Sequence, residues 1–176
     1  MEKLSIKLRI VITTLFIIAI TGVLLWEYTH DGVVTHYILH SDDMPGISNW
    51  WGLIIIPLFT WVVSSFIKID SNDSTAVQHR NILIRVLILF LIGCSITYIF
   101  TVYPESNFPL YITAALVIIS FFIPIHKAEY LLGYVLGTFF VFGTFIPVIA
   151  GSILWILFYI FYKTPRIIHS FIKTKQ

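Results

Sequence analysis

Charged residues are scarce in this sequence. Asp, Glu, Lys and Arg together make up 11% of the 176 residues, whereas 58% of the residues are hydrophobic and the mean hydropathy is +0.92. A soluble domain needs far more polar surface, so the composition excludes that class and indicates a helical membrane protein. The alternating pattern of a membrane β-barrel is absent, because the apolar runs are continuous.

Cysteine and the common catalytic motifs are also missing. Cys94 is the single cysteine, which excludes an intrachain disulfide and any CxxC or Cys/His zinc motif. The sequence has no Gly-rich phosphate loop, no GxSxG motif and no basic, aromatic surface for nucleic acid. No histidine lies inside a predicted span, which disfavours a bis-histidine haem. Nucleic acid is therefore not an expected partner, and the lipid bilayer is.

Apolar runs close to the ~20 residues that cross a bilayer recur along the whole chain. The first run follows a basic N-terminal segment, and no small-x-small cleavage site comes after it, so we expect an uncleaved first span. Little sequence is left for a soluble domain, so residues 1–176 are predicted to form one integral membrane domain. The first four predicted spans are residues 10–26, 50–67, 82–100 and 109–125.

Residues 131–162 contain no charged residue and can be interpreted in two ways. A single helix of this length would be about 48 Å long, which is too long for one span without strong tilt. Gly143, Pro147 and Gly151 cluster near the midpoint and favour a break into two short spans. A short or re-entrant hairpin, which enters the membrane and returns, is the alternative.

Basic residues are confined to alternate connections. If the N-terminus is cytoplasmic, residues 27–49 and 101–108 lie outside and contain no Lys or Arg, whereas all eleven Lys and Arg residues lie inside. The positive-inside rule favours this arrangement. Because the tail is basic too, the chain must cross an even number of times between residues 127 and 163. The sequence therefore predicts an all-α, polytopic bundle of six transmembrane helices in a plasma or bacterial inner membrane, with both termini cytoplasmic.

The tail, residues 164–176, places Ile167, Ile168, Phe171 and Ile172 among basic residues. This pattern predicts a short amphipathic helix that lies on the anionic inner leaflet.

The longest break between apolar runs, residues 27–49, is rich in histidine and acidic residues. If residues 33–39 are helical, His36 and His40 share one helix face, and Asp43 lies near the same stripe. Two imidazoles and a carboxylate suit a divalent metal ion, most naturally zinc. Candidate acid/base groups are Glu27 and His30, at the end of the first span. Further polar candidates are Asp31, Asp42, Asn49, Glu105 and Glu129.

Each of these signals has a plainer alternative. The HxxxH spacing is a weak metal signal, and a solvated interfacial loop with Asp-Gly and Pro-Gly turns explains the same residues. Ser48 or Asn49 is expected to cap the second helix, although Asn49 could instead line a pocket beneath the histidines. Glu129 either pairs with a nearby Lys or Arg or turns into the bundle as a proton or cation site.

Three functions compete on this evidence. The first is a His/Asp metal- or polar-ligand-binding site at the extracytoplasmic face, which could belong to a membrane-embedded, metal-dependent enzyme that acts on a lipid-level substrate. The second is a small transporter or channel with an external acidic vestibule. The third is a non-catalytic assembly subunit, which contacts a second copy or a membrane partner through the GxxxG of Gly133 and Gly137. We predict the first and leave open whether the protein is an enzyme.

Overall fold

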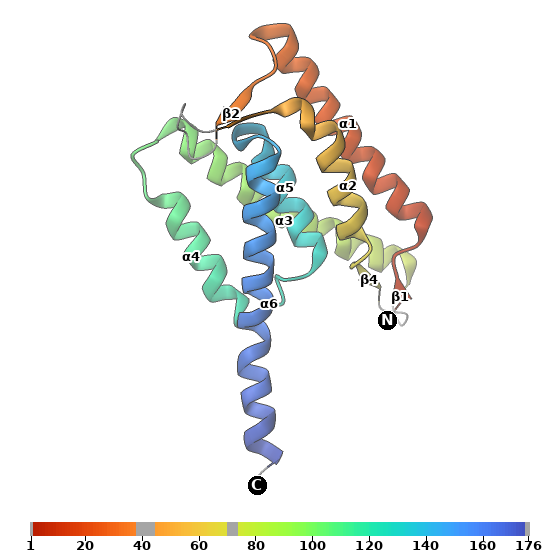
Figure 1. Ribbon diagram of the computed structural model, residues 1–176. Helices are drawn as coiled ribbons and strands as arrows, with labels where there is room; N and C mark the ends of the chain where they lie inside the picture. The colour runs from red at the N-terminus through yellow and green to blue at the C-terminus, as the bar shows by residue number, and fades with distance from the viewer. Residues whose placement is uncertain (1, 38–44, 70–73, 175–176) are drawn as a thin grey trace.

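The computed structural model describes residues 2–37, 45–69 and 74–174. Within this part of the chain, six α-helices and two small β-ribbons form the fold (Figure 1). The helices are α1 (Ile6–His30), α2 (Gly52–Ser64), α3 (Thr75–Val102), α4 (Phe108–Ser120), α5 (Ala128–Phe142) and α6 (Phe145–Thr174), and the 3-10 helix η2 (Asn49–Trp51) leads directly into α2. The predicted all-helical class is confirmed.

Three helices, α1, α3 and α6, are long and apolar enough to cross a membrane. The others, α2, α4 and α5, have 13, 13 and 15 residues, or about 20–22 Å, against ~30 Å of hydrocarbon. Large apolar side chains cover the outer faces of the bundle; Ile18 is 62% exposed and Leu91 61%. Water is a poor solvent for so much exposed hydrocarbon, so the fold supports a membrane location.

The chain runs back and forth between two ends of the bundle. At one end, β1 (Glu2–Lys3) pairs antiparallel with β4 (Lys68–Ile69). We call this the basic end, because Lys127 and Lys163 line a cavity there together with Lys68. At the other, the polar end, β2 (Thr35–Tyr37) pairs antiparallel with β3 (Gly46–Ser48). Both termini lie toward the basic end (Figure 1).

A tight turn at Gly143 separates α5 from α6. Gly143 has φ +70°, a region that glycine enters readily and other residues do not. A Cβ atom at this position would lie 2.4 Å from Cδ2 of His36, so the turn also needs a residue without a side chain. The predicted break between two helices is therefore confirmed. Pro147 lies in the first turn of α6, where proline is tolerated.

Glycines allow α3 and α5 to approach closely. A Cβ atom on Gly133 would lie 2.1 Å from the carbonyl oxygen of Val86, and one on Gly137 would lie 2.4 Å from that of Phe90. Such backbone contact is the usual role of small residues at helix interfaces in membranes. The GxxxG motif thus packs two helices of the same chain together, and its use toward a second copy or another protein stays a prediction.

Arginines of two long helices cap the ends of two short ones. Arg9 of α1 donates from Nη2 to the carbonyl oxygen of Trp61 in the last turn of α2, at 2.8 Å. Arg166 of α6 donates from Nη1 to the carbonyl oxygen of Phe121, just beyond α4, at 3.0 Å. The last carbonyl groups of a helix have no partner within it and carry partial negative charge. Each guanidinium therefore fastens a short helix to its long neighbour.

The third short helix, α5, is held at its first turn. Arg85 of α3 forms an ion pair with Glu129, with Nη1 and Oε1 2.9 Å apart. A carboxylate in the first turn is also favoured by the helix dipole.

The tail is the end of α6 and not a separate helix. α6 continues through Pro165 to Thr174 without interruption. Figure 1 shows its C-terminal part projecting beyond the other helices. The predicted helical tail is present, but it extends the last apolar helix along the same axis.

Candidate functional site

Three of the predicted polar residues meet at the polar end. Glu27, in the last turn of α1, is only 9% exposed. Its Oε1 accepts a hydrogen bond from Nδ2 of Asn49 at 2.8 Å, and its Oε2 accepts one from the backbone N–H of Val34 at 3.1 Å. Nδ2 of Asn49 also lies 3.4 Å from Nε2 of His36. We call Glu27, His36 and Asn49 the polar-end cluster.

The polar-end cluster packs against the turn between α5 and α6. His36 and Asn49 line a cavity of about 10 Å³ with residues of this turn, among them Gly143 and Thr144. The Thr144 hydroxyl is buried and has no hydrogen-bond partner. His36 and Asn49 thus line one small space together, and its volume suits about one water molecule.

His36 reaches the polar-end cluster from a strand. The prediction of a helix over residues 33–39, which would place His36 and His40 on one face, is wrong, because Thr35–Tyr37 forms β2. Alternation along the strand exposes Thr35 and Tyr37 and turns His36 inward. β-Branched and aromatic neighbours favour this extended backbone. Ser48 is the predicted cap: its hydroxyl accepts from the backbone N–H of Trp50 at the start of η2.

Other predicted site residues lie apart from the polar-end cluster. His30 and Asp31 are exposed, and the His30 ring stacks on Trp26 with the ring centroids 3.7 Å apart. Glu105 is exposed in the turn after α3. The described residues contain no group of three or more His, Cys, Asp or Glu side chains that could hold a metal ion. The predicted residues His40, Asp42 and Asp43 lie outside the described residues.

Glu129 lies at the opposite end of the molecule. It is 2% exposed, and its ion pair with Arg85 confirms the interpretation in which this carboxylate has a basic partner. Sequence reasoning expected such a partner among nearby Lys or Arg residues, and Arg85 is the one that the packing of α3 on α5 supplies.

A cavity of about 510 Å³ lies beside Glu129 at the basic end. This volume falls within the usual range of ligand-binding pockets, about 300–1,000 Å³. Residues from the α2–α3 connection, the α4–α5 connection, the start of α5 and one face of α6 surround the space. The lining residues are Phe66, Lys68, His126, Lys127, Ala128, Glu129, Trp155, Ile156, Tyr159 and Lys163. We call this space the basic-end cavity.

Positive charge dominates the basic-end cavity. Its lining includes three lysines, Lys68, Lys127 and Lys163, and one carboxylate, Glu129, whose charge Arg85 balances. Burial lowers the pKa of Lys127, and the nearby guanidinium of Arg85 lowers it further, although Glu129 opposes this. A lowered lysine pKa means that the surroundings disfavour the ammonium form relative to water, here mainly through burial.

His126 presents an unpaired nitrogen in the same region. Its Nδ1 is buried and has no hydrogen-bond partner, and its ring contacts Tyr159 and Tyr162 of α6. Burial lowers the pKa of His126, and the positive charges of Lys163, Lys127 and Arg166 lower it further. The imidazole is therefore neutral at pH 7.

The start of α5 adds to the positive electrostatic potential of the basic-end cavity. Lys127 occupies the N-cap position, and no side chain caps the helix there. The N-terminus of a helix carries partial positive charge and N–H groups without partners inside the helix, both of which favour an anion. Ala128 and Glu129, in this first turn, line the cavity. The arrangement is therefore suited to bind a negatively charged group.

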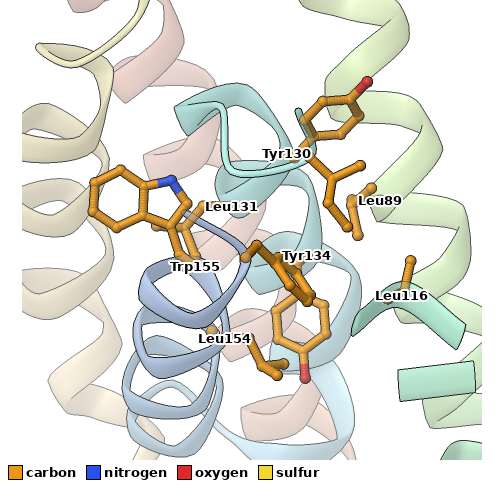
Figure 2. Close-up of a pocket in the computed structure, with 10 residues that line it drawn as sticks. Leu89, Leu116, Tyr130, Leu131, Tyr134, Leu154 and Trp155 are labelled. Atoms are coloured by element: carbon orange, nitrogen blue, oxygen red, sulfur yellow. The ribbon is translucent and has the colours of Figure 1, made fainter. Parts of the chain in front are cut away.

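A second, smaller pocket shows where the basic-end cavity ends. This pocket lies between α3, α4, α5 and α6 and has a volume of about 10 Å³. Figure 2 shows some of the side chains that line it, among them Leu89, Leu116, Tyr134 and Leu154. Trp155 lines both spaces, so its indole lies between them. Nε1 of Trp155 donates to the carbonyl oxygen of His126, which fixes the ring.

Sequence reasoning missed the basic-end cavity. The positive-inside rule placed Lys68, Lys127 and Lys163 on one side of the membrane but gave no reason to bring them together. The available signal was a lysine within two residues of an aromatic ring at each of these positions: Phe66 near Lys68, His126 beside Lys127 and Tyr162 beside Lys163. No family model, curated protein or solved structure matches the chain, so function must be argued from this geometry.

Proposed function

We propose that the protein binds an anionic ligand in the basic-end cavity, at the cytoplasmic face of a cell membrane. The observation that carries the proposal is the set of three lysines and the uncapped start of α5 around a cavity of about 510 Å³. Positive groups at a partly desolvated site bind an anion more strongly than the same groups in water, because the local dielectric constant is lower. Glu129 does not oppose this, since Arg85 balances its charge.

The membrane topology is part of the proposal. All six helices are proposed to cross, with both termini cytoplasmic, because the basic end gathers lysines of two connections and of α6, and cytoplasmic segments carry an excess of Lys and Arg. Labelling of single cysteines on a Cys94→Ser background tests this. We expect Glu105→Cys to react with an impermeant maleimide on intact cells and Thr164→Cys to react only after lysis. The reverse pattern would refute the orientation.

Binding is tested with purified protein and inorganic phosphate or glycerol 3-phosphate as probes, by isothermal titration calorimetry. We expect Lys127→Gln and Lys163→Gln each to weaken binding about tenfold, because a hydrogen bond to a charged group contributes roughly 1.5 kcal/mol. Lys173→Gln is the matched control: it removes the same charge from an exposed position of α6 outside the cavity. Equal losses in all three variants would mean that only net charge matters, and the site would be rejected.

The polar-end cluster supports a second candidate function, the predicted metal- or polar-ligand site of the extracytoplasmic face. The specific observation is that Glu27 and His36, a carboxylate and an imidazole, converge on the side chain of Asn49. Both are zinc ligand types, and zinc with an open position would activate water for attack on a lipid-level substrate. Elemental analysis of protein purified without a metal-affinity tag tests it. If the protein holds less than about a tenth of an equivalent of metal, and His36→Ala holds the same amount, this candidate is rejected.

A further inference from the structure

We infer that the ligand of the basic-end cavity is a membrane lipid with a phosphate-bearing anionic headgroup, which enters from the bilayer between α2 and α6. The inference rests on the proposed function and specifies its ligand. A soluble phosphate compound offers the same headgroup chemistry, so the question is whether the cavity is also built for a hydrocarbon chain.

The cavity changes from charged to apolar along α6. Lys163, Tyr159 and Ile156 line it at intervals of four and three residues, which places them on one face of the helix. Lys163 lies seven positions after Ile156, a separation of about 10 Å along the helix axis. A soluble anion would contact only the end near Lys163. A lipid aligned with α6 would match both ends, with its headgroup at the lysines and its chain toward Ile156.

The side of the cavity between α2 and α6 is open. Phe66, just after α2, lines the cavity and is 54% exposed, and Ile156 and Tyr159 on α6 are 52% and 50% exposed. In a membrane bundle, apolar side chains at this depth face lipid. The rings of Phe66 and Trp155 approach with their centroids 5.9 Å apart. Phe66 and Trp155 thus connect the end of α2 to α6 at the apolar end of the cavity. The hydrocarbon chain of a bound lipid would pass over these two rings into the bilayer.

The charged end is suited to a phosphate group. Lys127 and Lys163 come from different elements and line the same space. Nδ1 of His126 is buried without a partner in the α4–α5 connection, and this residue also lines the cavity. A phosphate monoester offers acceptor oxygens to both lysines. The charged end of the cavity therefore offers two ammonium groups to one phosphate group.

The experiment compares three probes on the purified protein in detergent micelles: dioctanoyl phosphatidic acid, glycerol 3-phosphate and dioctanoyl glycerol. We expect phosphatidic acid to bind at least about tenfold more tightly than either of the others, because it alone has both the charge and the chain. Equal affinity for phosphatidic acid and glycerol 3-phosphate would overturn the lipid inference and leave the proposed function standing. Equal affinity for phosphatidic acid and the neutral diglyceride would overturn both, as would a failure of all three probes to bind.

Two pairs of variants separate the ends of the cavity. We expect Ile156→Ala to weaken binding of phosphatidic acid about threefold to tenfold and to leave glycerol 3-phosphate unchanged. The matched control is Ile160→Ala, which removes the same atoms from an exposed position of α6 outside the lining. Lys163→Gln should weaken both anionic probes, and Lys173→Gln neither. An equal loss of affinity for phosphatidic acid in Ile156→Ala and Ile160→Ala would refute a hydrocarbon chain beside Ile156. The comparison of the three probes on the unmodified protein remains valid even if a variant fails to fold.

Discussion

The ion pair between Arg85 and Glu129 predicts an unequal response to loss of either partner. The Glu129 side chain is 3% exposed and that of Arg85 is 26% exposed. Removing Arg85 leaves a nearly buried carboxylate without its partner, whereas removing Glu129 leaves a guanidinium on a long side chain that can reach the membrane surface. Arg85→Met is therefore expected to be the more damaging change.

The magnitudes follow from this difference in burial. Breaking a buried pair so that one charge stays buried costs about 3–5 kcal/mol, and the lower end applies here because Arg85 is partly exposed. We expect a loss of about 3 kcal/mol in the free energy of unfolding for Arg85→Met and of about 1 kcal/mol for Glu129→Met. The double variant should recover to within about 1 kcal/mol of the parent, because an apolar pair of similar volume leaves no charge buried.

Reversible unfolding in mixed micelles of dodecyl maltoside and SDS measures these free energies. Arg9→Met is a suitable control, because it removes the same guanidinium from a position that pairs with a backbone carbonyl oxygen and leaves no carboxylate behind. If Glu129→Met is as damaging as Arg85→Met, or if the double variant is the least stable of the three, then burial of the carboxylate does not govern the pair.

Three more results are expected from the same unfolding measurement. Gly143→Ala should cost about 2 kcal/mol or more, because the left-handed backbone disfavours a side chain and the new Cβ meets His36; a neutral effect would contradict the observed turn. Asn49→Ala should cost about 1.5–3 kcal/mol, because the Glu27 carboxylate loses a charge-assisted hydrogen bond, and no loss would show that water replaces the amide. Since the folded state lowers the pKa of His126 from 6.5, protonation favours the unfolded state. Stability should therefore fall as the pH drops below about 6.5, less steeply in His126→Gln; identical pH slopes would exclude His126 as the cause.

The sequence predicted the helices well, because long runs of apolar residues mark the segments of this chain that form them. Helix ends were less predictable. α1 continues past the predicted end at residue 26 to His30, because backbone hydrogen bonding does not stop where the side chains become polar. This extension places Glu27 inside the helix and turns it toward Asn49. α2 and α4 instead end at Ser64 and Ser120, before the predicted spans end at residues 67 and 125.

The sites were harder to predict than the helices, since spacing along the chain carries no information about them. Glu27 and Asn49 are 22 residues apart and meet only because the β2–β3 ribbon brings η2 back onto α1. Lys68 and Lys127 belong to two connections and Lys163 to α6, and their approach depends on how α5 and α6 pack. A spacing such as HxxxH is informative only if the local helix forms, and at His36 a strand forms instead.

The pair of Arg85 and Glu129 also has a consequence for biosynthesis. The two residues are separated by 44 positions, with α4 between them. At a synthesis rate of about 5–20 residues per second, Arg85 is made roughly 2–9 s before its partner exists. During that interval α3 has a guanidinium near one end of an apolar segment without its carboxylate, so the arginine must stay at the headgroup level. We expect the arrival of Glu129 to allow α3 to settle against α5, which would couple the final depth of α3 in the bilayer to completion of the next helical hairpin.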